Sequence, residues 1–327
     1  MMSAYSPDSQ AAPAPLRHLL IADAAPLPQL ADADAPPLPP LPNLDALLAR
    51  LRPTHTLTCD EGSPETPHAL AVARANGLPG EPGRLPWAAF ESGTVGTPCA
   101  WLRPAHLQMG MDDVQLIGLD QLELSAEESE QLMAAVAPLL TDDGLTLRHA
   151  FPGAWLAQGE LLRHLFAPAP ERAAGRLLTR TELARADDPA QQRQLARLLS
   201  ELEMVLATHP VSQVREAARR WPINAVWVHG AGALDAPLPP APGVRVAPQL
   251  SQGAAAQDPA TQAAAWQAID RGEAAELLAS LRAGVPVQLT LSGPERAVTL
   301  APSGSGLWSR VSSLFGRPTL MELRKQL

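Results

Sequence analysis

The residue types best suited to ligand binding or catalysis gather between residues 209 and 232. Arg215 is a candidate anion-binding residue, because a guanidinium donates paired hydrogen bonds to carboxylate and phosphate groups. The alternative is an ordinary surface arginine on a helix. His229 is a candidate proton carrier, since imidazole titrates near neutral pH. No Asp or Ser accompanies His229 in the sequence, so we assign no catalytic residue.

Four further residues of this stretch have both a ligand-binding and a structural interpretation. His209 could contact a phosphate-bearing ligand, or bond the last carbonyls of a helix. Asn224 could bind a ligand, or bond backbone across a turn. Gly230 and Gly232 could cradle a phosphate, or form a tight turn. The turn lacks the third glycine and the following helix of a dinucleotide site, and proline-rich sequence follows it.

The elements that must position these residues can be predicted from local patterns. Leucines repeat at helical spacing and predict an amphipathic helix that ends at Pro210; they are Leu195, Leu198, Leu199, Leu202 and Leu206. A second, basic helix follows over 211–220. The β-branched run 223–228 predicts a buried strand, and the glycines turn the chain at its end.

The remainder of the chain predicts an α/β or α+β fold, in which a mixed sheet has flanking helices and the loops are proline-rich. Strands are expected over 16–23, within 97–119, over 145–158 as a hairpin, over 243–250, and over 285–302 as a second hairpin. Helices are expected over 44–51, 66–78, 86–93, 125–140, 160–166 and 263–284. Ser125 and Glu128 match a capping box at the start of the fourth of these helices.

Four regions are predicted along the chain. They are a disordered tail over 1–15, an N-terminal α/β region over 16–158, a second α/β region over 159–302, and a basic amphipathic tail over 303–327.

Composition limits the function classes. The net charge of −9 argues against a nucleic-acid binder, which needs a basic face. The two cysteines, Cys59 and Cys99, form no CxxC motif, and they fit a reducing compartment. The sequence shows no signal-peptide pattern and no apolar run long enough to span a bilayer. We therefore expect a soluble, cytoplasmic protein.

The stretch 198–232 resembles two related groups of proteins. One is the proteobacterial RpfE-type regulatory proteins, often labelled putative phosphoglycerate mutases, and the other is the archaeal-type cofactor-independent phosphoglycerate mutases. The resemblance rests on a His-Pro-Val helix end, an Arg-bearing helix, a Pro-x-Asn-x-x-Trp strand and a G-x-G turn. The matching positions are His209, Pro210, Val211, Arg215, Pro222, Asn224, Trp227, Gly230 and Gly232. Ser212 and His229 depart from the pattern. Segments 99–132 and 143–157 resemble the RpfE-type group specifically, so that likeness covers roughly 86–235, whereas the likeness to the mutases covers about 145–250.

The resemblance to the mutases implies a catalytic centre that this sequence lacks. In those enzymes two metal ions, held by Asp and His near both chain ends, activate a serine nucleophile. Asp23 could imitate the first Asp ligand, but no His follows His229 and no Asp/His ligand cluster occurs in the last 95 residues. We therefore expect neither a metal site nor a cofactor.

The leading interpretation is a non-catalytic, cytoplasmic regulatory or binding protein of RpfE type that binds a small phosphorylated or anionic ligand, or a protein partner. One alternative is a phosphoglycerate mutase-like or metal-dependent phosphohydrolase enzyme. A second is a scaffold protein that acts through its proline-rich segments and tail. The apolar residues of the tail could dock on the body, on a partner or on a membrane surface; they are Trp308, Val311, Leu314 and Phe315.

Overall fold

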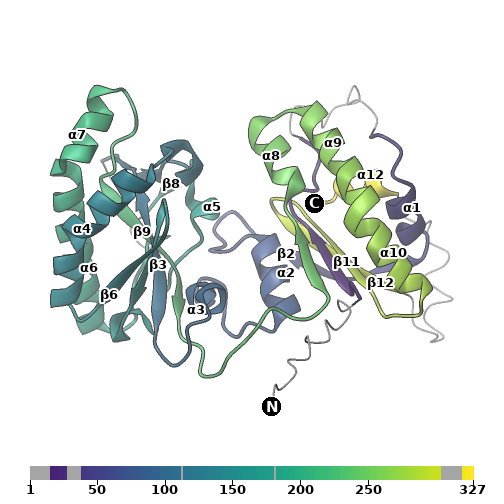
Figure 1. Ribbon diagram of the computed structural model, residues 1–327, viewed down its shortest axis with the longest axis horizontal. Coiled ribbons are helices and arrows are strands. Elements are labelled where there is room, and N and C mark those ends of the chain that lie inside the picture. Colours follow the sequence, from purple (N-terminus) through teal and green to yellow (C-terminus); the bar gives the residue numbers. More distant parts are fainter. Residues whose placement is uncertain (1–14, 28–37, 112, 180–181, 303–318) are drawn as a thin grey trace, which may run out of the picture. The chain divides into compact units, whose positions relative to one another are not determined.

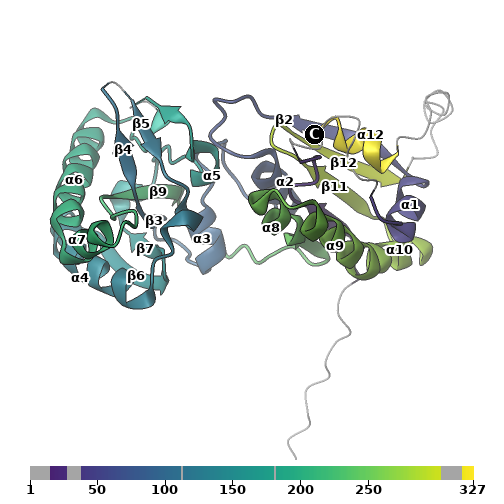
Figure 2. The same cartoon turned by 90° about the horizontal axis from the view of Figure 1, so that it is seen from above.

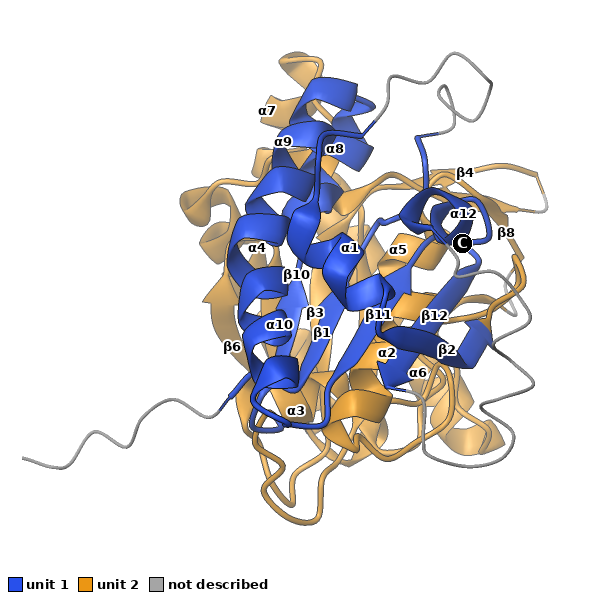
Figure 3. Ribbon diagram, turned by 90° about the vertical axis from the view of Figure 1, so that its right-hand side faces the viewer, with its two compact units in different colours: residues 1–57, 241–327 blue, residues 58–240 orange. Residues whose placement is uncertain are grey.

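The computed structural model describes residues 15–27, 38–111, 113–179, 182–302 and 319–327 (Figure 1). The chain forms two compact units, which Figure 3 distinguishes by colour. Unit 1 comprises Met1–Leu57 and Ala241–Leu327, and unit 2 is the continuous segment Thr58–Pro240. The boundary expected between residues 158 and 159 coincides with neither junction. The reason is that segments from the two ends of the sequence pair in one sheet, which no local pattern reveals.

Unit 1 is built on a five-stranded mixed sheet, here called sheet A. Its strand order is β10 (Val244–Ala247), β1 (His18–Ile21), β11 (Gln288–Ser292), β12 (Arg296–Pro302) and β2 (Leu51–Thr58). Strand β1 is parallel to both β10 and β11, whereas β11 and β12 form the predicted antiparallel hairpin. Every residue of β1 is buried, as expected for a central strand with a continuous apolar run.

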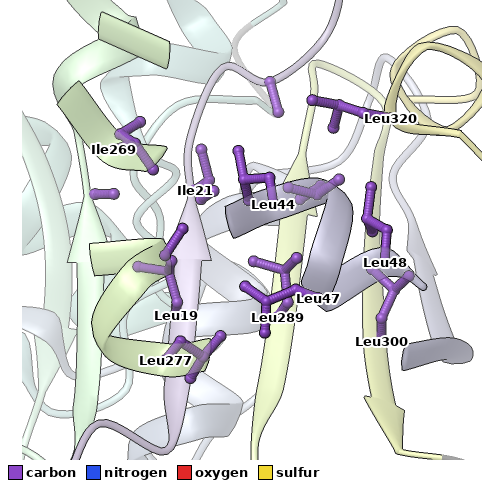
Figure 4. Close-up of a cluster of buried hydrophobic side chains, with 14 of the residues drawn as sticks. Leu19, Ile21, Leu44, Leu47, Leu48, Ile269, Leu277, Leu289, Leu300 and Leu320 are labelled. Atoms are coloured by element: carbon purple, nitrogen blue, oxygen red, sulfur yellow. The ribbon is translucent and has the colours of Figure 1, made fainter. Parts of the chain in front are cut away.

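Helices of unit 1 pack on sheet A through an aliphatic core. They are α1 (Pro42–Leu48), α8 (Gln249–Ala256), α9 (Pro259–Ile269), α10 (Ala275–Arg282) and α12 (Leu320–Arg324). Figure 4 shows how Leu19 and Ile21 of β1 meet Leu44, Ile269 and Leu277 from three of these helical segments. The helix predicted over 263–284 is interrupted by a π-helical turn, Asp270–Ala274. Strand β2 and helix α8 were not predicted, because their polar and small residues carry little apolar periodicity.

Unit 2 contains a four-stranded antiparallel sheet, sheet B, and a small three-stranded sheet, sheet C. The order in sheet B is β6 (Thr146–Phe151), β7 (Ala154–Gln158), β3 (Cys99–Ala105) and β9 (Ala225–Gly232). The order in sheet C is β4 (Leu107–Met109), β5 (Val114–Leu116) and β8 (Leu177–Leu178). The mixed sheet A and the helices that flank the sheets of both units confirm the predicted fold class.

Helices cover both faces of sheet B. The helices of unit 2 are α2 (Pro67–Asn76), α3 (Trp87–Ser92), α4 (Ala126–Asp142), α5 (Pro170–Ala173), α6 (Pro189–Thr208) and α7 (Pro210–Ala217), with 3-10 turns at Leu119–Leu122 and Glu160–Leu162. Helices α4 and α6 lie on one face, and α3 lies on the other (Figures 1 and 2). The leucine stripe of α6 is buried against the sheet, except that Leu199 is only partly buried. The capping box of Ser125 and Glu128 is present at the start of α4. The helix expected over 160–166 is reduced to one of the 3-10 turns.

Several predictions concern residues outside the described parts. They include residues 1–14 of the expected disordered tail and the apolar residues of the tail between 303 and 318. Within the described residues, no helix combines the length and the apolar character needed to cross a bilayer.

Candidate functional site

Arg215 is a buried structural residue of unit 2. Its side chain is 1% exposed, and all three guanidinium nitrogens donate hydrogen bonds inward. Nε donates to the Trp221 carbonyl over 2.8 Å, Nη1 donates to Oε2 of Glu128 over 2.7 Å, and Nη2 donates to the Leu122 carbonyl. Arg215 thus joins α7 to the start of α4. Neither an anion-binding nor a surface interpretation describes this geometry.

His209 and Asn224 also bond the backbone in the structure. His209 is the N-cap of α7, and its Nδ1 accepts from the Val211 amide over 3.2 Å. The Asn224 side chain accepts from the Leu107 amide over 2.8 Å and donates to the Leu107 carbonyl over 2.9 Å. The Asn224 amide therefore continues the pairing of β3 and β9 beyond the end of the strands, the structural alternative of the two predicted.

Gly230 and Gly232 allow α3 to approach β9 closely. Gly230 has φ +63°, and a Cβ there would lie 2.8 Å from the Cβ of Trp87. Gly232 has φ +146°, and its Cβ would lie 3.0 Å from the Cβ of Pro86. Both positions require glycine because of close helix packing.

His229 lies beside these glycines and pairs with Trp101 across the β3–β9 ladder. Its Nε2 is buried without a hydrogen-bond partner among the described residues. Burial, with a contribution from the positive charge of Arg103, lowers the pKa of His229 to about 3. The imidazole is therefore neutral at pH 7, far from the midpoint that a proton carrier needs.

The residues that could imitate a metal centre belong to different units of the chain. Asp23 lies in unit 1 and its carboxylate accepts from the Ser251 hydroxyl, whereas His209 and His229 lie in unit 2. Within the described part of the chain, no group of three or more His, Cys, Asp or Glu side chains is arranged to hold a metal ion.

A pocket of about 260 Å³ in unit 2 is lined by several charged side chains. It is lined by residues 62–64, by parts of 166–178, and by Glu182 and Arg185. Three guanidiniums line it, those of Arg172, Arg176 and Arg185, against the single lining carboxylate of Glu182. We call it the arginine pocket.

Local contacts fix the three guanidiniums in place. Arg172 donates through Nε to the Ser63 carbonyl over 3.2 Å, which joins α5 to the loop before α2. Arg176 donates to Oε1 of Glu182 over 3.0 Å, and its Nε lies 3.7 Å from Oε1 of Glu61. The Arg185 guanidinium lies over the Phe166 ring, 3.7 Å from its centroid, a cation–π contact that orients it.

A side chain of strand β9 holds one of the segments that line the arginine pocket. The Trp227 indole donates to the Pro168 carbonyl over 2.9 Å and fixes the segment that carries Phe166. Gly83 allows this ring to approach, since a Cβ at Gly83 would lie 2.6 Å from it.

Comparisons with known proteins show a distant likeness of fold. No protein family profile matches the chain, and no curated protein matches it. Among solved structures, the chain is similar to the cofactor-independent phosphoglycerate mutase from Thermoplasma acidophilum DSM 1728, at 16% identity and a TM-score of 0.37, over 89% of this chain and 91% of that one. It is also similar to the PH0037 protein from Pyrococcus horikoshii, at 14% identity and a TM-score of 0.41, over 89% of this chain and 88% of that one.

Both likenesses concern the fold alone. They carry no argument about the site, and the resemblance to the RpfE-type group stays a prediction.

Sequence reasoning missed the arginine pocket, because its residues come from segments that carry weak secondary-structure signals. The available signal was the density of arginine over 172–185, where Arg172, Arg176 and Arg185 lie within two short elements and their loops. It also missed Glu65, which is 2% exposed in the loop before α2. Burial raises the pKa of Glu65 to about 7, although the Gly83 amide and the Trp87 side chain donate to the carboxylate.

Proposed function

We propose that this protein is a non-catalytic binding protein whose arginine pocket holds a small anionic ligand. The observation that carries the proposal is the convergence of Arg172, Arg176 and Arg185 on one pocket of about 260 Å³. Pockets near this size suit a small metabolite rather than a macromolecule. Guanidiniums are the side chains best matched to carboxylate and phosphate oxygens.

The arginine pocket also holds two of its guanidiniums in fixed orientations. Arg172 and Arg176 are anchored by the Ser63 carbonyl and Glu182, so they need not be ordered when a ligand binds. Phe166 gives the same pocket an apolar wall. A ligand with a phosphate or carboxylate group on a short carbon skeleton fits this combination.

We further propose that the protein is regulatory and of RpfE type. Support comes from the matching positions between His209 and Gly232, most of which hold the local fold here. A fold that carries a ligand pocket is sufficient for a regulatory protein, which requires no catalytic centre. The mutase-like alternative requires Asp and His ligands near both chain ends, and no His follows His229 in the sequence. The scaffold alternative concerns tail residues that lie largely outside the described parts.

The test is a titration of the purified full chain with inorganic phosphate, 3-phosphoglycerate and glycerol, read by calorimetry. We expect binding of the two anions and none of glycerol. Substitution R176M or R185M removes one charged donor and should weaken binding by about tenfold, the effect of roughly 1.4 kcal/mol. The matched control is R193M, which removes an exposed arginine of α6.

Equal weakening by R193M would show that binding follows net charge and not the pocket. If neither inorganic phosphate nor 3-phosphoglycerate binds, the ligand proposal is overturned. Turnover of 3-phosphoglycerate that requires added Mn²⁺ and is abolished by a chelator would overturn the non-catalytic part and favour the mutase-like alternative.

A further inference from the structure

Unit 1 contains a buried cation that none of its described contacts neutralises. Arg324 of α12 is 4% exposed. Its Nε donates to the Ala24 carbonyl over 2.8 Å, and its Nη2 donates to the Ala25 carbonyl over 3.3 Å and to Oε1 of Gln262 over 3.2 Å. All three acceptors are neutral. Burial lowers the pKa of Arg324 to about 10, which leaves the guanidinium charged at pH 7.

Two orphaned donors lie next to this guanidinium. The Nε2 of Gln262 and the Nε1 of Trp266 are both buried without a hydrogen-bond partner among the described residues. The two residues are four positions apart on α9, so their side chains share one helix face. Arg324 bonds the Gln262 amide and lies over the Trp266 ring, 5.4 Å from its centroid. One charged and two neutral donor groups are therefore adjacent.

Physical chemistry makes this arrangement unusual for a purely structural contact. A buried charge is normally paired, because the loss of hydration costs several kcal/mol per ion. A buried donor without an acceptor likewise loses the free energy of a hydrogen bond. A single anion would both pair with the buried charge and accept hydrogen bonds from the donors that lack an acceptor.

The position in the fold agrees with a ligand site. Ala24 and Ala25 follow the carboxyl end of β1, which is parallel to β10 and β11. Ligands of open α/β sheets bind beyond the carboxyl ends of parallel strands. The backbone there is tied to β11, because the Ala24 amide donates to the Ser292 carbonyl over 2.7 Å.

We propose that Arg324, Gln262 and Trp266 form a binding site in unit 1 for a small monovalent anion, either a halide or a compact carboxylate. This site is independent of the arginine pocket in unit 2, and it goes beyond the proposed function. Bound anion would connect α9 to α12 and stabilise the C-terminal helix against sheet A.

The first test uses chloride and acetate as probes with the full chain, at constant ionic strength made up with sodium gluconate, whose anion is larger than either probe. We expect the Tm to rise by about 3–5 °C when the anion reaches tenfold its Kd. A response to chloride but not acetate identifies a halide site, and a response to acetate identifies a carboxylate site. The W266F variant keeps an aromatic ring but loses the N–H with the five-membered part of the indole, so its response should be several-fold weaker.

The matched control is R271M, which removes an exposed arginine of unit 1 and should leave the response intact. A second measurement is anomalous diffraction from crystals soaked in bromide, with a peak expected between Arg324, Gln262 and Trp266. An ordered water at that place, with no Tm response to either anion, would overturn the proposal.

Discussion

The guanidinium of Arg215 and the carboxylate of Glu128 are joined by a 2.7 Å ion pair in which the arginine is almost fully buried. The same carboxylate closes the capping box of α4 by accepting from the Ser125 amide over 3.0 Å. Arg220 reaches the other oxygen of Glu128 at 3.4 Å from an exposed position. The Glu128 carboxylate therefore pairs with the buried Arg215 and the exposed Arg220, and it also caps the start of α4.

This relationship predicts unequal effects for the two arginines. R215M leaves Glu128 without its buried partner and frees two carbonyls, so we expect a loss of about 3–5 kcal/mol in the free energy of unfolding. R220M should cost less than about 1 kcal/mol, because its pair with Glu128 is exposed. Urea unfolding of both variants measures the difference. If both variants lose less than about 1 kcal/mol in the free energy of unfolding, the contacts of Arg215 contribute little to stability, and the residue is available to bind a ligand.

Glu65 predicts a pH dependence of stability. Its folded-state pKa of about 7 exceeds the ordinary value of 4.5, so the folded protein keeps a proton that the unfolded chain releases. The Glu65 contribution to the free energy of unfolding is therefore full below about pH 4.5, falls as the pH rises to about 7, and is constant above that. The total change is about 3 kcal/mol at most.

The E65Q variant should lack this contribution, because glutamine stays neutral and its amide oxygen can accept the same bonds. Urea unfolding of both proteins at pH 5 and pH 8 gives the comparison. We expect E65Q to gain stability relative to the native chain at pH 8 but not at pH 5. An identical pH response in the two proteins would contradict the buried, neutral state of Glu65.

At Gly230 the stability cost of a steric clash can be measured separately from the cost of backbone strain. Gly230 and Gly144 both have positive φ, at +63° and +75°, but a Cβ at Gly144 meets no atom within 4 Å. We expect G144A to cost about 1 kcal/mol from conformation alone. G230A should cost about 1–3 kcal/mol more, since its Cβ would collide with Trp87. Similar losses in thermal unfolding would show that α3 can move away from β9.

Unit 2 should fold as an isolated fragment. The segment 58–240 is continuous, and the three apolar clusters that include residues of sheet B contain only its own residues. We expect residues 58–240 to unfold cooperatively in urea and to give a dispersed NMR spectrum. A fragment that binds a hydrophobic dye and melts without cooperativity would show that unit 2 depends on unit 1 for its core.

Local sequence determined the elements that have strong periodicity. The leucine stripe of α6, the capping box of α4 and the apolar strand at 223–228 all follow from residue spacing, because the geometry of helices and strands fixes which side chains share a face. Weakly patterned elements such as β2 and α8 could not be predicted in this way, since their positions depend on neighbours that the local sequence does not specify.

Tertiary structure alone decided what the buried and pocket-lining arginines do. Arg215 meets Glu128 across 87 positions of sequence, and Arg324 meets Ala24 across 300. The arginine pocket likewise joins the loop at 62–64 to residues more than a hundred positions later. A guanidinium has the same donors in every sequence context, whereas its role depends on burial and on the acceptors that long-range packing brings to it.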